Sequence, residues 1–207
     1  MGAATEDGSS GYEAIADIYI AGRGTRARVG DSVGAAVVKA WADAFPPGAT
    51  VLDLGSGPGE PSTRILQEAG LTTYAVDASA AMVAAFRDRF PGVPIERSTV
   101  EASEFFNRTV SGVLAWGLMF LLDPAAQALV IEKVARALEP GGRFLFTAPR
   151  QPLEWLDAMT GRPSPAAYSD GPDRSFRRHP IAESDGLDRR SERSDEGGRL
   201  RVSASGS

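Results

Sequence analysis

Three glycines at alternate positions, Gly55, Gly57 and Gly59, follow the apolar run 50–54 and precede a segment with helical spacing. Glycine permits a tight turn and lets a ligand approach the backbone without meeting a Cβ atom. The amide groups of the following helix then point at whatever occupies the turn. Several nucleotide-binding chemistries share such a turn, so by itself it indicates only a nucleotide-like ligand.

Two acidic residues beside the turn indicate the charge of that ligand. Glu60 replaces the third glycine of the dinucleotide pattern G-x-G-x-x-G, and its carboxylate would repel a pyrophosphate. Asp53, just before the turn, suits an ammonium or sulfonium group. We therefore expect a ligand that is cationic at this end, which disfavours the alternative of a nucleotide-dependent oxidoreductase.

A third carboxylate, Asp77, ends the apolar run 72–76, twenty residues after Gly57. In an α/β fold, an acid at the end of the second strand can accept hydrogen bonds from both hydroxyls of a ribose. The alternative is that Asp77 only caps a helix beginning near Ser79. Beside the glycine turn, the ribose interpretation is the favoured one.

The elements that must position these residues alternate along the chain. Apolar runs predict strands at 50–54, 72–76, 93–95, 110–116 and 142–147. Helical spacing predicts helices at 12–21, from Asp31 to about 45, and at 61–69, 79–90 and 123–138. We predict an α/β fold: a Rossmann-like, doubly wound, mostly parallel sheet in three layers (α/β/α), with an incomplete or irregular C-terminal end.

The 207 residues are expected to form one domain. Residues 1–10 are interpreted as a disordered lead-in, 11–161 as the cofactor-binding domain, and 162–207 as an irregular, disordered tail. The tail has nine Arg, nine Ser and few large apolar residues. A natural extension and an out-of-frame reading of GC-rich coding DNA both remain open as explanations. With no strand expected after residue 160, the run 142–147 would be an exposed edge, through which a homodimer could form.

Composition narrows the classes of partner. The net charge of −5 gives no electrostatic footprint for nucleic acid or an anionic membrane. The absence of cysteine excludes disulfides, thiolate metal sites and cysteine nucleophiles, and we expect no metal. No secretory signal and no apolar run of ~18 residues is visible, so a cytoplasmic location away from membranes is expected. The lone His179 lies in the tail and is not expected to be catalytic.

Three segments taken together resemble the class I S-adenosylmethionine-dependent methyltransferases: Val51–Gly59 (VLDLGSGPG), Tyr74–Met82 (YAVDASAAM) and Leu138–Phe146 (LEPGGRFLF). They occur in the family's order and spacing, and the resemblance covers residues 11 to about 160. It implies S-adenosylmethionine as the cofactor. The segment 138–142 is expected to be a helix stop and a turn into a strand, with a structural role.

The resemblance also implies which residues form the cofactor site. Asp53 would face the amino-acid end of the cofactor, Asp77 would hold the ribose hydroxyls, and Val100 with Glu101 would contact the adenine. The full set is Asp53, Gly55, Ser56, Gly57, Gly59, Asp77, Ala78, Met82, Val100, Glu101 and Trp116.

Several of these residues have a structural alternative. Met82 and Trp116 could be plain core residues, and Glu101 could be an acid favouring the first turn of a helix. Tyr12 and Tyr19 lie in an N-terminal helix that often covers the site in such enzymes, or they are packing aromatics.

The expected reaction is transfer of a methyl group to a small organic acceptor by in-line displacement. Because the sulfonium methyl is already electrophilic, the protein mainly has to align donor and acceptor. No catalytic residue can be named. Phe120, Leu121, Trp155 and Met159 suggest an apolar acceptor wall. The alternative is a protein that binds S-adenosylmethionine but is catalytically impaired by its aberrant C-terminal segment.

Overall fold

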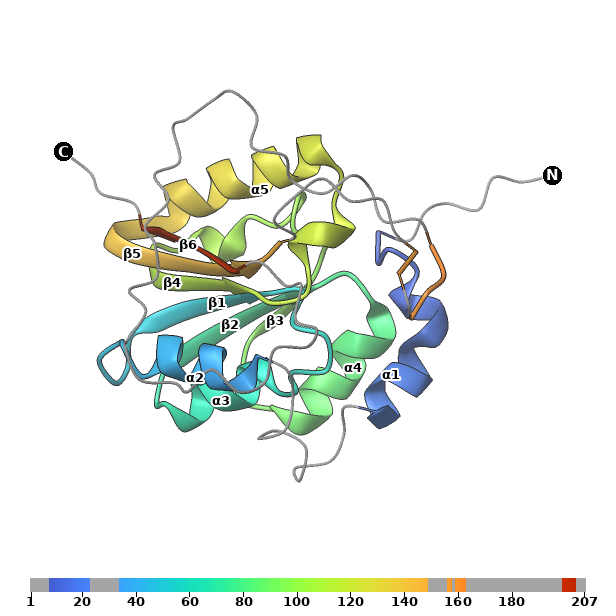
Figure 1. The fold of residues 1–207 in the computed structure, drawn as a ribbon. Helices are drawn as coiled ribbons and strands as arrows, with labels where there is room; N and C mark the ends of the chain where they lie inside the picture. Colours follow the sequence, from blue (N-terminus) through green and yellow to red (C-terminus); the bar gives the residue numbers. More distant parts are fainter. Residues whose placement is uncertain (1–7, 23–33, 149–155, 158, 163–198, 204–207) are drawn as a thin grey trace, which may run out of the picture.

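The apolar runs of the sequence form a single six-stranded sheet in the computed structural model, which describes residues 8–22, 34–148, 156–157, 159–162 and 199–203 (Figure 1). The strand order is β3-β2-β1-β4-β5-β6, and all neighbours are parallel except β5 and β6. The strands are β1 (Thr50–Leu54), β2 (Thr72–Asp77), β3 (Ile95–Arg97), β4 (Val110–Ala115), β5 (Leu138–Thr147) and β6 (Arg199–Ser203). The predicted Rossmann-like fold class is confirmed.

Helices lie on both faces of this sheet (Figure 1). In chain order they are η1 (Tyr12–Ile15), α1 (Ala16–Gly22), α2 (Ala35–Ala42), α3 (Ser62–Glu68), α4 (Ala80–Arg89), η3 (Phe105–Asn107), η4 (Met119–Leu121) and α5 (Pro124–Ala137). The helices α2, α3 and α4 cover one face, and α5 covers the other. None of the described helices is both long and apolar enough to cross a membrane.

Alternation along the strands divides the core between the two faces. Val51, Leu114 and Leu145 pack with α2 and α3, whereas Leu52 and Phe144 pack with α5. All five side chains are buried, as expected for parallel strands that are covered on both faces. A third cluster, which includes Phe86 and Phe90, places α4 beside β2.

The strand order reverses between β1 and β4, and this determines where a site can form. From β1 the chain moves outward to β2 and β3, then returns to β4 on the other side of β1. Ligands of open α/β sheets bind at the carboxyl ends of the strands where this reversal occurs. Gly55, Asp77 and Trp116 directly follow or end β1, β2 and β4, so they converge at this point.

Two predicted boundaries differ from the structure. Gly34, with a φ of 90°, occupies the N-cap position of α2, while the expected cap Asp31 lies outside the described residues. The segment 138–142 belongs to β5 instead of forming a turn before it. The pairing of β5 with β4 shifts register there, from Val110 opposite Leu138 to Gly112 opposite Arg143. Because glycine and proline occur both in turns and in irregular stretches of strand, the sequence did not distinguish the two here.

The expectation of an exposed edge at 142–147 was wrong. Strand β6 pairs with β5 in antiparallel register, from Arg143 opposite Ser203 to Thr147 opposite Arg199. Leu200 and Val202 alternate with arginines, but a period of two over five residues does not stand out in an Arg- and Ser-rich tail. The proposed homodimer through β5 loses its structural basis. The rest of the tail, 163–198, lies outside the described residues.

Candidate cofactor site

An open cavity lies at the carboxyl ends of β1, β2 and β4, where ligands bind in open α/β sheets. Its walls come from the glycine turn after β1, the end of β2, the first turn of α4, and the loops after β3 and β4. Residues 8–10 and two tyrosines of η1 and α1 add a wall from the N-terminal segment.

Eight of the eleven predicted cofactor residues line this cavity. They come from four separate segments of the chain, so their convergence is a product of the fold. They are Gly55, Gly57, Asp77, Ala78, Met82, Val100, Glu101 and Trp116.

The other three lie behind the cavity wall. Asp53 is 1% exposed and accepts a 2.6 Å hydrogen bond from the Thr63 hydroxyl on α3. Ser56 is buried, and its hydroxyl has no partner among the described residues. Gly59 has a φ of 83°, and a Cβ atom there would collide with the Phe90 ring, so packing alone requires this glycine.

Asp77 is held by the backbone on both sides of the site. One carboxylate oxygen accepts a 2.7 Å hydrogen bond from the Gly57 amide, and the other accepts 2.9 Å from the Ser79 amide. Burial raises the pKa of Asp77, these two amides oppose the rise, and the charge of Glu13 adds to it. The N-cap of α4 is Ser79, whose hydroxyl accepts from the Met82 amide. Each Asp77 oxygen keeps a lone pair for a ligand hydroxyl.

Burial also raises the pKa of Asp53, to about 7. The Thr63 hydrogen bond lowers this pKa, and the nearby charge of Asp77 raises it. Asp53 therefore takes up and releases a proton near neutral pH, directly behind the glycine turn. A cationic ligand in front of the turn would favour its charged form.

Glu13 is a site residue that the sequence did not reveal. Its carboxylate, from η1, accepts a 2.6 Å hydrogen bond from the Ser79 hydroxyl and a 3.3 Å one from the Ala81 amide. It thus fastens the N-terminal segment to the start of α4, beside Asp77. Its partners lie 66 and 68 residues away, so no local pattern could predict the contact.

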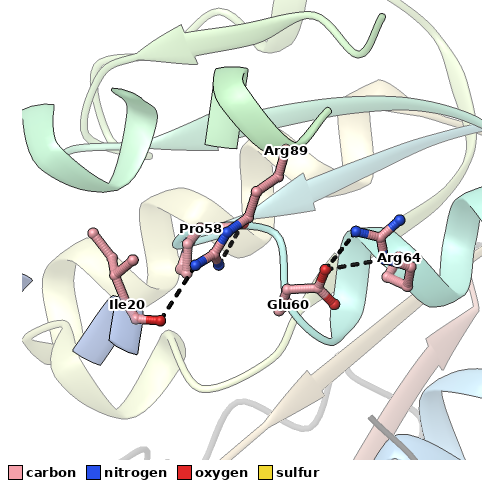
Figure 2. A network of polar contacts seen from close by, with 5 residues as sticks. All are labelled: Ile20, Pro58, Glu60, Arg64 and Arg89. Atoms are coloured by element: carbon pink, nitrogen blue, oxygen red, sulfur yellow. Dashed lines mark hydrogen bonds and ion pairs between the residues drawn. The ribbon is translucent and has the colours of Figure 1, made fainter. Parts of the chain in front are cut away.

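A second link joins α1 to the glycine turn, as Figure 2 shows. Arg89, at the end of α4, donates to the carbonyls of Ile20 (3.3 Å) and Pro58 (3.5 Å). On the other side of the turn, Glu60 pairs with Arg64 at 2.6 Å. Glu60 is therefore turned toward α3 and does not line the cavity, where we expected it to repel a pyrophosphate.

Tyr12 and Tyr19 both line the cavity and contact each other edge to face, with ring centroids 5.4 Å apart. The Tyr12 hydroxyl donates to Asp157 at 3.2 Å, which joins the N-terminal segment to the chain after β5. Of the expected acceptor wall, Leu121 lines the cavity and Met159 is 48% exposed. Trp155 and His179 lie outside the described residues.

The chemistry of the lining fits S-adenosylmethionine. Among the described lining residues, Asp77 and Glu101 are acidic and none is basic, which suits a sulfonium cation and not a diphosphate. Met82, Val100 and Leu122 offer an apolar surface for a purine. Elsewhere in the described chain, no three His, Asp or Glu side chains gather so that they could hold a metal ion.

Comparison with known proteins indicates a methyltransferase domain. Residues 51–142 match the family described as "Methyltransferase domain". Dimethylglycine N-methyltransferase from Parasynechococcus marenigrum is 30% identical over 112 residues. That match spans 52% of this chain but only 40% of the relative.

Solved structures agree on the fold. Magnesium protoporphyrin IX methyltransferase from Synechocystis, solved with bound S-adenosylmethionine, has a TM-score of 0.67 at 18% identity, covering 99% of this chain and all of that one. A 4+2 cyclase has a TM-score of 0.55 at 16% identity, and the match covers 70% of this chain and 60% of the cyclase. Residues 51–142 therefore match a methyltransferase domain, and the sheet that contains them has the fold of a methyltransferase solved with S-adenosylmethionine.

Proposed function

We propose that the protein transfers the methyl group of S-adenosylmethionine to a small organic acceptor. The observation that carries this proposal is the cavity itself. It combines a carboxylate held ready for a ribose, an acidic and apolar lining without basic residues among those described, and a cover of two tyrosines.

In this proposal, each part of the cofactor occupies a different end of the cavity. Asp77 accepts from the ribose hydroxyls, and Met82 packs on the adenine, which Val100 and Glu101 contact through an amide and an acceptor group. Gly55 and Gly57 leave room for the methionine part. Asp53 acts from behind the turn as a buried negative charge when ionised.

When bound, the cofactor supplies a methyl group that is already electrophilic. The protein's residues then have to orient the acceptor in line with it and keep water away. Proximity and orientation can lower such a barrier by ~7–11 kcal/mol. Tyr12, Tyr19 and Trp116 line this space. We assign no general base.

Two observations support a small acceptor. Trp116, Leu118 and Leu121 make the wall after β4 apolar, and the described lining has no basic side chain that could bind a phosphate backbone. The names of two similar proteins give dimethylglycine and magnesium protoporphyrin IX as substrates, both of which are small molecules. Since a 4+2 cyclase shares the fold, however, the fold alone does not determine the reaction.

A direct test has two steps. Calorimetry should detect binding of S-adenosylmethionine and S-adenosylhomocysteine, but not of NAD. Methyl transfer from radiolabelled S-adenosylmethionine is then screened against amines, carboxylic acids, phenols and porphyrins. A tRNA and a protein mixture are tested in parallel as macromolecular acceptors. Transfer only to a macromolecule would contradict the small-acceptor proposal. Cofactor binding without any transfer would favour a protein that binds the cofactor without turnover.

A further inference from the structure

The loop between β3 and β4 contains a single helical turn, residues 99–103, at the wall of the cavity. The amides of Ala102 and Ser103 donate to the Thr99 carbonyl at 3.2 and 2.9 Å. The Thr99 hydroxyl also accepts from Ala102 at 3.3 Å, as an N-cap does. Thr99, Val100 and Glu101 line the cavity, so the turn forms part of the surface where we place the adenine.

Lys133 of α5, which does not line the cavity, holds this turn through hydrogen bonds. Its ammonium group donates to the carbonyls of Val100 (3.2 Å), Glu101 (2.7 Å) and Ser103, and it lies 4.9 Å from the centre of the Phe105 ring. An ammonium group has three N–H donors, so these three carbonyls satisfy all of them. Among the described residues, no acid forms an ion pair with Lys133. A partly buried cation is thus committed entirely to the backbone of one turn.

This arrangement orients the turn. The carbonyls of a helical turn point opposite to its first amides. With the carbonyls directed at Lys133, the amides of Val100 and Glu101 are left at the cavity end, and no acceptor for them exists among the described residues. A cation at the carbonyl end also stabilises the dipole of the turn.

We propose that Lys133 is a positioning residue for recognition of the cofactor's base. By fixing three carbonyls of turn 99–103, it sets where the amides and the Glu101 side chain meet the adenine, and so determines selectivity for a 6-amino purine. This inference rests on the proposed placement of adenine beside Val100 and Glu101. A merely structural role would lower stability without changing selectivity between bases.

Selectivity can be measured with two ligands that differ only at the base. Calorimetry compares S-adenosylhomocysteine with its analogue in which oxygen replaces the adenine 6-amino group. We expect the native protein to prefer the adenine ligand by about tenfold or more, because the analogue leaves the half-buried Glu101 acceptor unpaired. In Lys133→Met the ratio of the two Kd values should fall at least about fivefold, even if both ligands bind more weakly. Lys39→Met, at an exposed lysine paired with Asp43, should keep the native preference.

The outcomes separate the inference from the proposed function. If the native protein binds neither ligand, the cofactor assignment itself fails. If it binds both equally, the adenine placement fails, and the inference with it. An unchanged preference in folded Lys133→Met would overturn the inference alone.

A measurement on the native chain remains decisive even if Lys133→Met does not fold. Lys39 and Lys133 are the only lysines, so mass spectrometry can follow acylation of each one. We expect saturating S-adenosylhomocysteine to slow acylation of Lys133 several-fold relative to Lys39, because a bound base stiffens the turn. An unchanged ratio of the two rates would overturn the inference.

Discussion

The carboxylate of Asp77 accepts a 2.7 Å hydrogen bond from the amide of Gly57, which ties the end of β2 to the glycine turn after β1. A second hydrogen bond, from the Ser79 amide, fixes the other carboxylate oxygen. The group that we assign to the ribose is therefore oriented before any ligand binds. Pre-orientation of this kind lowers the entropic cost of binding.

The first prediction concerns this carboxylate. Asp77→Ala removes the acceptor for the ribose and releases the Gly57 amide. Hydrogen bonds to charged groups contribute ~1.5–3 kcal/mol each. The Kd of S-adenosylhomocysteine should therefore rise by about tenfold to a hundredfold or more, measured by calorimetry.

Asp88→Ala is the matched control, because Asp88 is an exposed acid on the adjacent helix α4. It should leave the Kd within about twofold of the native value. If Asp77→Ala and the native protein bind S-adenosylhomocysteine with equal affinity, Asp77 does not hold the ribose.

The second prediction concerns pH and Asp53. Burial raises the pKa of this group from 3.8 to about 7 in the folded protein. The neutral carboxyl group of Asp53 favours the folded state, and this contribution is fully present below the pKa that Asp53 has in the unfolded chain. It is lost as the pH rises through the folded-state pKa of about 7. Ionising the buried carboxyl therefore costs at most about 4 kcal/mol, at 1.36 kcal/mol per pKa unit.

Urea unfolding of the native protein and Asp53→Asn, from pH 4.5 to 8, measures this cost. The difference in unfolding free energy should move in favour of Asp53→Asn as the pH rises, and it should level off above about pH 8. The pH slope is more informative than either absolute value, since Asn keeps an acceptor for Thr63 but adds donors. The exposed control Asp88→Asn should show no such slope, and a flat Asp53→Asn difference would contradict the pKa argument.

Much of the fold could be predicted because its strands are short apolar runs separated by turn residues. The predicted strand 50–54 coincides with β1, and 72–76 falls one residue short of β2. β3 was misplaced by two residues, since only Ile95 of the predicted 93–95 belongs to it. β6 was missed because its pairing with β5 depends on backbone hydrogen bonds between residues about sixty positions apart, which leave no local pattern.

The site was predictable where it depends on the strand ends, and not where it depends on distant side chains. Asp77 and the glycine turn follow from sequence spacing. Glu13, Arg89 and Lys133 contact the site from other elements across 30 to 69 residues, and each looks locally like an ordinary charged residue on a helix. Gly59 fitted the ligand-binding pattern, although the Phe90 ring alone requires a glycine there.

The third prediction concerns the edge of the sheet. Truncation after residue 198 removes β6 and leaves unpaired the backbone groups on the edge of β5 that faces away from β4. An unpaired edge strand promotes association with other chains. We expect the truncated protein to scatter more light on warming and to show a lower Tm. Truncation after residue 203 retains β6 and is the control; identical behaviour of both truncated forms would argue against the β5–β6 pairing.

The fourth prediction concerns the N-terminal segment, which α4 holds at both of its ends. Glu13 contacts Ser79 and Ala81 at the start of α4, and Arg89 contacts Ile20 at its end. Loss of either link should loosen the segment that carries Tyr12 and Tyr19 over the cavity. Cofactor dissociation, followed by stopped-flow fluorescence, should therefore become faster while association changes little.

We expect a larger effect from Glu13→Ala than from Arg89→Met. The Glu13 carboxylate accepts at 2.6 Å, whereas the two hydrogen bonds of Arg89 are 3.3 and 3.5 Å long and therefore weaker. Dissociation should accelerate by roughly tenfold for Glu13→Ala and by a few-fold for Arg89→Met. Asp17→Ala and Arg87→Met, at exposed positions on α1 and α4, are the matched controls. If the two pairs of variants dissociate at the same rate, the N-terminal segment does not retain the cofactor.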